Sequence, residues 1–283
     1  PDCFFKRGKY MSDLLPSNTQ SFDTGAARLI AGVEATATGM IGHLRFNLPE
    51  KHNVIDLEGW QAMTPVMQKF AATDNIRLII LRGIGGKAFV AGADIAQFEE
   101  VLSGPDGTDF DRATIAAFDA IADCPIPTLA AIEGYCIGGG LGVAAACDLR
   151  LARSDSRFGI PAGKLGLAYP ANATHQLAQL VGVSEAKRII FTAANLSVDD
   201  ALNNGLISLA ADADDFDATL AMLVTQISAN APMSLQASKF VLNTPHADAE
   251  EVKKRLADCL ASADYAEGWR AFMEKRKPEF KGR

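Results

Sequence analysis

The apolar residues of this chain fall into short β-type runs that alternate with stretches of helical spacing. Residues 28–33 and 40–46 flank Gly39 and predict the two strands of a hairpin. Residues 57–72 have the apolar spacing of a helix, and residues 77–81 predict a short buried strand. This alternation is typical of a parallel sheet whose strands are joined by crossover helices.

The same alternation continues through the middle of the chain. We expect a helix from Asp94, a helix over residues 111–123, a strand over 128–132, a glycine-led helix ending at Cys147 and a strand over 149–152. Residues 103–108, with the sequence SGPDGT, combine several turn-forming residues and predict a mobile loop. The predicted fold class is therefore α/β.

Strand patterns nearly vanish from Thr174 onward, and the rest of the chain predicts helices. One helix start is marked by Ser197 and Asp200, which have the spacing of a capping box. We divide the chain into an N-terminal extension (1–26), a core (27–205) and a helical C-terminal region (206–283). Residues 1–10 precede Met11, which we expect to be the natural start.

Composition and charge narrow the class of protein. The chain has 283 residues, 48% of them hydrophobic and 22% charged, which is ordinary for a soluble globular protein. A net charge of −7 argues against a nucleic-acid surface. The apolar stretch around Gly138 contains Glu133 and begins with strand character, so we reject a membrane span. We expect a cytoplasmic protein that binds neither nucleic acid nor membrane.

The cysteines form no C-x-x-C pair and stand mostly among apolar neighbours. They are Cys3, Cys124, Cys136, Cys147 and Cys259. We interpret them as buried free thiols in a reducing compartment. Cys136 lies beside a run of glycines, but no histidine is near it in sequence, so a nucleophilic role is disfavoured.

That glycine run lies in the most informative stretch of the chain, residues 126–148. An apolar β-type run breaks at Gly134 and reopens through Gly138, Gly139 and Gly140 into a helix of small residues. Glycine lets the main chain approach another group closely, and a helix start offers unpaired N–H donors at its positive end. The stretch therefore suits a developing negative charge, with tight helix packing as the alternative interpretation.

Glycine runs also occur in phosphate-binding loops, but this run has the wrong spacing. Neither G-x-x-x-x-G-K-[ST] nor G-x-G-x-x-G is present around Gly138. A nucleoside triphosphate or dinucleotide site is therefore not expected.

Six segments in order resemble the crotonase, or enoyl-CoA hydratase/isomerase, superfamily over about residues 29–283. They are residues 47–53 (NLPEKHN), 87–95 (KAFVAGADI), 127–148, 157–161 (RFGIP), 196–206 and 272–277 (FMEKRK). The resemblance implies a spiral of repeated ββα units with a helical C-terminal region that mediates trimer contacts, often in a dimer of trimers. It also implies an acyl-CoA thioester as ligand, with coenzyme A as part of the substrate and no separate cofactor.

The resemblance also implies the positions of the site. In such proteins two backbone N–H groups hold the thioester carbonyl oxygen, and the matching positions are Ala93 and Gly139. The CoA adenine would meet main-chain groups near Ala91, and its phosphates would meet Lys51 and the Lys275 of a neighbouring subunit. The residues implied to bind substrate are Lys51, Ala91, Asp94, Ile95, Gly138, Ala162, Tyr169, Phe272 and Lys275.

The chain departs from the hydratase pattern at the two positions where glutamates usually activate water. These positions carry Gly142 and Ala162, neither of which can transfer a proton. Loss of general acid–base catalysis commonly costs about 100-fold to 10,000-fold in rate per group. Hydration by the usual two-glutamate route is therefore doubtful.

Other polar side chains are weaker candidates for chemistry. Tyr169 could donate a hydrogen bond to the acyl group, although packing alone would also explain it. Structural roles suffice for the remaining ones, which are Asp94, Glu99, Glu100, Glu133, Asp148, His43, His52 and His175. No two histidines have metal-ligand spacing, so no metal site is expected.

These observations leave several hypotheses about function. The first is an acyl-CoA enzyme of the hydratase/isomerase kind that stabilises a thioester enolate. Decarboxylation of a malonyl-type thioester fits the missing glutamates at least as well as hydration does, since it needs an enolate site more than a base. A catalytically silent acyl-CoA binder is a further alternative, whereas RNA binding lacks the basic stripe that it would need.

Overall fold

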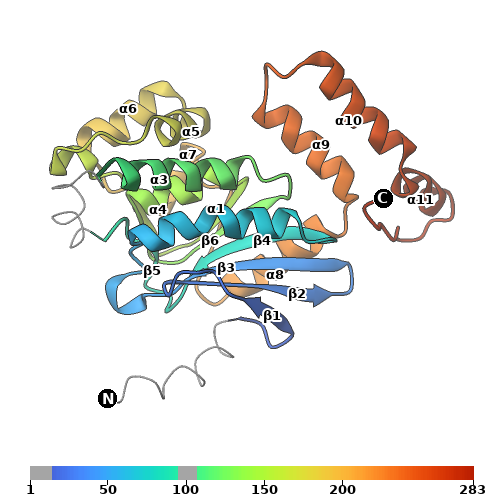
Figure 1. The fold of residues 1–283 in the computed structure, drawn as a ribbon, viewed down its shortest axis with the longest axis horizontal. Coiled ribbons are helices and arrows are strands. Elements are labelled where there is room, and N and C mark those ends of the chain that lie inside the picture. The colour runs from blue at the N-terminus through green and yellow to red at the C-terminus, as the bar shows by residue number, and fades with distance from the viewer. Residues whose placement is uncertain (1–14, 95–106) are drawn as a thin grey trace.

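The computed structural model describes residues 15–94 and 107–283. They form a large sheet of seven strands in the order β1-β2-β3-β4-β6-β8-β10 and a small sheet in the order β5-β7-β9 (Figure 1). The strands are β1 (Thr19–Phe22), β2 (Leu29–Thr36), β3 (Gly39–Phe46), β4 (Ile76–Gly83), β5 (Ala88–Val90), β6 (Thr128–Ile132), β7 (Tyr135–Ile137), β8 (Leu149–Arg153), β9 (Arg157–Gly159) and β10 (Leu209–Ala211). The helices are α1 (Leu57–Ala71), α3 (Gly107–Ala122), α4 (Gly139–Ala146), α5 (Ala171–Val181), α6 (Val183–Thr192), α7 (Val198–Asn203), α8 (Phe216–Ser228), α9 (Pro232–Asn243), α10 (Ala249–Ala261) and α11 (Ala263–Met273), with 3-10 turns at Pro49–Lys51 and Ala162–Leu165.

The predicted α/β alternation is confirmed along most of the described chain. The hairpin of β2 and β3, helix α1 and strands β4, β6 and β8 lie where the apolar pattern places them, and the glycine-led helix is α4. The capping box at Ser197 is present at the start of α7. The predicted helix after Asp94 and most of the 103–108 loop fall outside the described residues, and Gly107 already belongs to α3.

The large sheet is antiparallel at one edge and parallel elsewhere. β1 pairs with β2 and β2 with β3 in antiparallel register, whereas β3, β4, β6, β8 and β10 pair in parallel. Parallel neighbours need a long connection, and the helices supply it, as the residue pattern predicts. The segment assigned to the N-terminal extension contains β1, which adds to the antiparallel edge.

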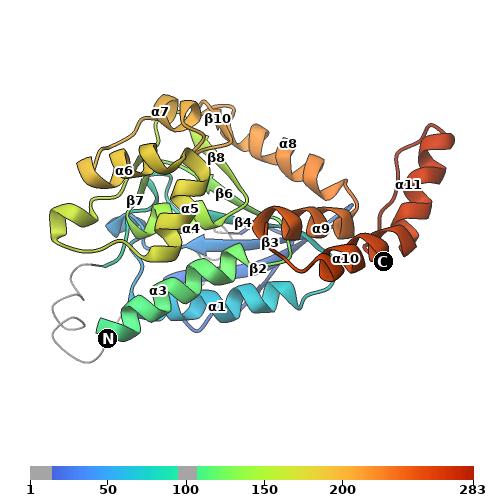
Figure 2. The same ribbon diagram turned by 90° about the horizontal axis from the view of Figure 1, so that it is seen from above.

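Two apolar layers cover the two faces of this sheet. A larger core contains Trp60, Met63 and Phe70 of α1 and Phe118 of α3, packed with strand residues that include Leu44 and with the small residues of α4. A smaller core on the opposite face packs Phe216, Leu220 and Leu223 of α8 against the strands. Figure 2 shows α1 and α3 together on one side and α8 on the other.

The small sheet was not predicted strand by strand, because three-residue strands are too short to give a periodic signal. Its strands are parallel and share a direction. The carboxyl end of each strand leads into a segment of the site described below: β5 into Ala91, β7 into Gly138 and β9 into Pro161. Since parallel strands end at the same edge, this sheet brings three distant segments together.

The C-terminal helices α9, α10 and α11 extend away from the sheet, and α11 lies far from β5 and β7 (Figures 1 and 2). Lys239 of α9 ties them to the core, because its Nζ donates to Asp148 at 2.7 Å and to the Ile126 carbonyl at 3.1 Å. Several large apolar side chains are exposed here, including Leu242, Trp269 and Phe272. Among the helices of residues 15–94 and 107–283, none is both long and apolar enough to cross a membrane.

Candidate active site

A cavity of about 280 Å³ is lined by the segments that follow β5, β7 and β9 and by α1 and α3. Its wall consists of Trp60, Ala91, Gly92, Ala93, Phe110, Asp111, Thr114, Phe118, Ile137, Gly138, Gly139, Pro161, Ala162, Leu165, Leu167, Ala168, Tyr169 and Pro170. The structure therefore brings together Ala91, Ala93, Gly138, Gly139, Ala162 and Tyr169, six of the positions singled out in the sequence.

The segment after β5 is held in place by backbone hydrogen bonds to residues 52–55. The Ala91 N–H donates to the His52 carbonyl, and the Ile55 N–H donates to the Gly92 carbonyl, each at 3.0 Å. The Asp94 N–H in turn donates to the Ile55 carbonyl at 3.0 Å. The Gly92 carbonyl and the Ala93 N–H belong to the same peptide unit, so the hydrogen bond from Ile55 also fixes the direction of the Ala93 N–H.

Asp94 anchors this segment by charge. Its side chain is buried and its carboxylate accepts a hydrogen bond from Arg28 at 2.8 Å. Arg28 also pairs with Asp56, the N-cap residue of α1. Lys51 reaches the same carboxylate at 3.7 Å while its side chain stays 55% exposed. Asp94 thus has a structural partner, and Lys51 remains accessible to solvent beside it.

The head of α4 provides the other side of the cavity. Gly138, the N-cap residue, has φ 56° and ψ −120°, a conformation that a side chain would strain. Its N–H donates to the Gly159 carbonyl at 2.8 Å, and its carbonyl accepts from the Leu141 and Gly142 N–H groups. Gly139 is the first helical residue, where the N–H has no partner inside the helix.

Two backbone donors, those of Ala93 and Gly139, therefore line one cavity. Within residues 15–94 and 107–283 neither N–H donates a hydrogen bond to the protein. The two loops touch, since the Cα of Gly92 lies 3.9 Å from the place that a Cβ on Gly139 would take. Fixed donors of this kind stabilise an oxygen that gains negative charge, by about 3 kcal/mol for one donor.

The alternative interpretation of the glycine run, that it allows close packing, is correct for Gly139 and Gly140. A Cβ on Gly140 would overlap the Val90 carbonyl, and a Cβ on Gly139 would lie 2.9 Å from Cζ2 of Trp60. Gly138 has no such crowding, and it is the positive φ that requires glycine there. The run therefore serves both close packing and the exposure of a backbone donor.

Tyr169 lines the cavity and contacts the head of α4. Its hydroxyl donates a hydrogen bond to the Gly138 carbonyl at 3.0 Å, and burial of the hydroxyl raises the pKa of Tyr169 well above its ordinary value. A phenol with a raised pKa keeps its proton, which suits a fixed donor better than a base. Tyr169 thus holds the turn that presents the Gly139 N–H.

The two positions that lack glutamate differ in their surroundings. At Gly142 the ring of Phe118 fills the space, because an ideal Cβ would lie 2.9 Å from its Cε1 and Cε2 atoms. Ala162 is half-buried and lines the cavity directly. No carboxylate could therefore stand at position 142 without moving Phe118.

Three polar side chains at the cavity wall were not singled out from the sequence: Trp60, Asp111 and Thr114. Asp111 is exposed, whereas Trp60 Nε1 and Thr114 Oγ1 are buried and have no hydrogen-bond partner among the described residues. Asp111, Thr114 and Phe118 share one face of α3 by their spacing of three and four residues. That spacing was visible, but the sequence does not say which helix face meets the glycines.

Other predicted residues lie elsewhere. Phe272 and Lys275, at the end of α11, are exposed and are not brought to the cavity by a single chain, and Ile95 lies outside the described residues. His175 is exposed on α5. The thiol of Cys136 is buried, and burial raises its pKa well above the usual range, which disfavours a nucleophilic role. The described residues contain no cluster of side chains that would hold a metal ion.

Comparison with known proteins agrees with this architecture. The model of the enoyl-CoA hydratase/isomerase family matches residues 36–283. The short-chain-enoyl-CoA hydratase of Clostridium acetobutylicum is 32% identical over 251 residues, covering 87% of this chain and 96% of the relative. The mitochondrial Delta(3,5)-Delta(2,4)-dienoyl-CoA isomerase of Mus musculus is 30% identical, covering 83% of this chain and 76% of the relative.

A solved structure gives the same result. The enoyl-CoA hydratase/carnithine racemase from Magnetospirillum magneticum superposes with a TM-score of 0.86 at 30% identity, covering 95% of this chain and 98% of that one. The fold and the arrangement of glycine-led segments define a crotonase-type enzyme. The chain belongs to the enoyl-CoA hydratase/isomerase family, and the resemblance seen in the sequence is confirmed.

Proposed function

We propose that this protein binds an acyl-CoA thioester and stabilises its enolate with the N–H groups of Ala93 and Gly139. The observation that carries the proposal is the presence of two unpaired backbone donors, from separate loops, at the wall of one cavity. A thioester carbonyl becomes an enolate oxygen when the neighbouring carbon loses a proton, or when its carboxylate leaves as carbon dioxide and the electron pair stays behind. Donors that are already in place stabilise that charge without reorganisation.

Proton transfer in this site would fall to a group other than the two usual glutamates. Among the described residues that line the cavity, Asp111 is the one with a carboxylate, and it lies one helical turn from Thr114 on α3. A carboxylate within reach of the acyl group can act as a general base. Isomerisation or hydration by this protein would therefore depend on Asp111. Tyr169 would hold the turn at Gly138 and Gly139, called the donor turn below, which presents the Gly139 N–H.

Decarboxylation of a malonyl-type thioester is the second candidate reaction. It is favoured by the surroundings of Gly142, where an aromatic ring replaces a carboxylate. Loss of carbon dioxide leaves the electron pair on the enolate and needs no base to start. An apolar wall assists it, because removing water from a carboxylate makes its loss easier.

The CoA portion would lie outside the cavity, toward residues that a single chain leaves exposed. Lys51 offers an ammonium group beside the Asp94 segment, and Phe272 and Lys275 would come from a neighbouring subunit of a trimer or a dimer of trimers. The exposed apolar side chains of α9–α11 support such an assembly, since patches of this kind mark interaction surfaces. No cofactor beyond the CoA of the substrate is needed.

Product analysis by mass spectrometry tests the proposal. The protein is incubated with enoyl-, 3-hydroxyacyl- and malonyl-type CoA thioesters, in parallel with the Asp111→Asn variant and with Asp109→Asn as a matched control on the same helix. Conversion of enoyl substrates that is lost in D111N but kept in D109N supports base catalysis by Asp111. Release of carbon dioxide in both variants supports a decarboxylase, and tight binding without turnover of any substrate means a silent acyl-CoA binder.

A further inference from the structure

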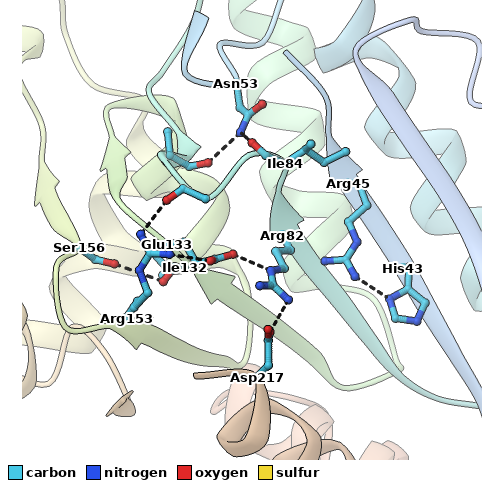
Figure 3. A network of polar contacts seen from close by, with 12 residues as sticks. His43, Arg45, Asn53, Arg82, Ile84, Ile132, Glu133, Arg153, Ser156 and Asp217 are labelled. Carbon is cyan, nitrogen blue, oxygen red and sulfur yellow. Dashed lines mark hydrogen bonds and ion pairs between the residues drawn. The ribbon is translucent and has the colours of Figure 1, made fainter. Parts of the chain in front are cut away.

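A row of charged side chains crosses the large sheet on the face that α8 covers. Arg45 of β3 and Arg82 of β4 are direct partners in the parallel register, so their side chains stand next to each other on that face. Glu133, just after β6, and Arg153, at the end of β8, continue the row (Figure 3). The row lies at the carboxyl ends of four adjacent strands.

The single carboxylate in the middle of the row, that of Glu133, is already shared by two arginines. Its Oε2 accepts from Arg82 Nε at 2.7 Å and its Oε1 accepts from Arg153 Nη1 at 2.8 Å. Arg82 and Arg153 have further partners in Asp217 and Asp155, whose side chains are 77% and 60% exposed. Both carboxylate oxygens of Glu133 thus already accept from an arginine, and neither forms an ion pair with Arg45.

Arg45 is the third guanidinium of the row, and it has no directly paired carboxylate among the described residues. The residue is 9% exposed, and its Nε is buried without a hydrogen-bond partner. Within the described chain its guanidinium makes one hydrogen bond, from Nη2 to Nδ1 of His43 at 3.4 Å, and no ion pair. A buried cation that lacks a direct ion pair is costly, and the carboxylates of Glu133, Asp217 and Glu34 favour the charge of Arg45 only from a distance.

His43 contacts Arg45 as a neutral hydrogen-bond acceptor. Its Nε2 pairs with Glu34 at 2.8 Å, and burial followed by the charge of Arg45 lowers the pKa of His43 to about 4. At neutral pH the ring is uncharged, so its Nε2–H donates to Glu34 and its Nδ1 accepts from Arg45. The carboxylate of Glu34 is thus held on the far side of the ring.

Arg45 also faces an open hollow. A second cavity of about 280 Å³ is lined by Arg45, Arg82, Glu133 and the loop of residues 83–86. Arg153 Nη2 holds the Gly86 carbonyl at 2.7 Å, which fixes this glycine loop against the row. Polar groups make up most of the hollow. The cavity lined by Ala93 and Gly139, called the acyl cavity below, has a largely apolar wall in contrast.

We propose that this hollow, bounded by Arg45, Arg82 and the 83–86 loop, is a binding site for a small oxyanion. A phosphate, sulfate or carboxylate group bound there would give Arg45 the direct ion pair that the described residues do not provide, and a guanidinium fork matches two oxygens of such a group. The site lies on the face of the sheet that packs against α8, apart from the acyl cavity, and does not depend on the function proposed above. The loop that it would hold leads into β5, the strand before Ala91.

The test measures the binding of inorganic phosphate to the full-length protein by isothermal titration calorimetry, at constant ionic strength set with KCl. Sulfate and acetate titrations distinguish a general oxyanion site from one for phosphoryl groups or carboxylates. We expect saturable binding with one phosphate per chain. In Arg45→Gln we expect a loss of affinity of about tenfold or more, because a charge-assisted hydrogen bond is removed. Arg188→Gln, an exposed arginine on α6, serves as the matched control and should bind as wild type does.

A measurement on the unmodified protein covers the case in which Arg45→Gln does not fold. Phosphate should shift the backbone amide resonances of Gly85 and Gly86 in a ¹H–¹⁵N spectrum and leave those of Gly138 and Gly139 in place. The proposal is overturned if phosphate, sulfate and acetate all fail to bind wild-type protein, or if they bind R45Q equally well. It is also overturned if R45Q changes the oligomeric mass while no anion binds, because the counter-ion would then come from another copy of the chain.

Discussion

The ring of Phe118 occupies the space into which a side chain at position 142 would extend. An ideal Cβ on Gly142 would lie 2.9 Å from two ring carbons and closer still to Cζ. Phe118 itself is fully buried and packs edge-on against Trp60, with ring centroids 5.6 Å apart. The packing of the core around Phe118 therefore leaves no room for a glutamate at position 142.

Restoring that glutamate should destabilise the protein. In Gly142→Glu the new side chain meets Phe118, and overpacking of a core costs about 1–3 kcal/mol even before a carboxylate is buried. Urea unfolding should show this loss of unfolding free energy. The double variant Gly142→Glu/Phe118→Ala should lose less than the sum of the two single changes. Simple additivity would show that the two positions do not compete for space.

Removing the Tyr169 hydroxyl should weaken the donor turn while the aromatic ring still fills its place in the cavity wall. Tyr169→Phe loses the hydrogen bond to the Gly138 carbonyl, worth about 1 kcal/mol of stability. If the turn presents the Gly139 N–H to the transition state, kcat should fall several-fold while KM changes little. Steady-state kinetics on whichever thioester proves to be turned over would measure both. A change confined to KM would mean that Tyr169 only contacts the substrate.

Stability should depend on pH through His43. The folded state lowers its pKa from 6.5 to about 4, so the unfolded chain binds the proton more readily between these values. The contribution of His43 to the free energy of unfolding is fully present above pH 6.5. It is lost as pH falls toward 4, by about 3 kcal/mol in all. Urea unfolding at several pH values should show a shallower decline in His43→Gln than in wild type. Equal slopes in the two proteins would contradict the assignment, and His175→Gln serves as an exposed control.

The Thr114 hydroxyl should be dispensable for folding. It is buried without a hydrogen-bond partner among the described residues, so Thr114→Val removes an unsatisfied polar atom and keeps the side chain's shape. We expect the unfolding free energy to rise by about 1 kcal/mol. Loss of stability in thermal or urea unfolding would mean that the hydroxyl has a partner after all. Thr128→Val is the contrasting control, because the Thr128 hydroxyl bonds to Asp148 at 2.9 Å and its loss should destabilise.

The strongly periodic elements were predictable because their residues repeat with the period of the structure. Helix α1 and strands β4 and β6 lie within a few residues of the predicted ranges, since each buries a continuous apolar face. The small sheet was not predictable in this way, because each strand has three residues and its pairing joins segments far apart in sequence. The family resemblance, not the periodicity, indicated the overall spiral.

The candidate site likewise has one part that local sequence indicates and another that depends on long-range packing. A run of glycines indicates a backbone turn with exposed N–H groups, so the donor turn at Gly138 and Gly139 could be inferred from the sequence. The part of the wall that α1 and α3 form, with Trp60 and Asp111, depends on how these two helices rotate about their own axes when they pack, and no local sequence pattern determines that rotation. Arg45 could not be singled out from the sequence, since its position beside Arg82, without a direct ion pair among the described residues, arises only once β3 and β4 are paired.

In the proposed function, the Ala93 and Gly139 N–H groups bind the thioester carbonyl. The most direct test is the ¹³C chemical shift of a carbonyl-labelled acyl-CoA bound to wild type, Gly139→Ala and Gly139→Pro. Both variants add a Cβ that faces Trp60, but only proline removes the N–H, and proline is tolerated at the first position of a helix. We predict a downfield shift on binding to wild type and to G139A that is largely lost in G139P. The same shift in all three proteins would show that the Gly139 N–H does not contact the carbonyl, and would contradict the account.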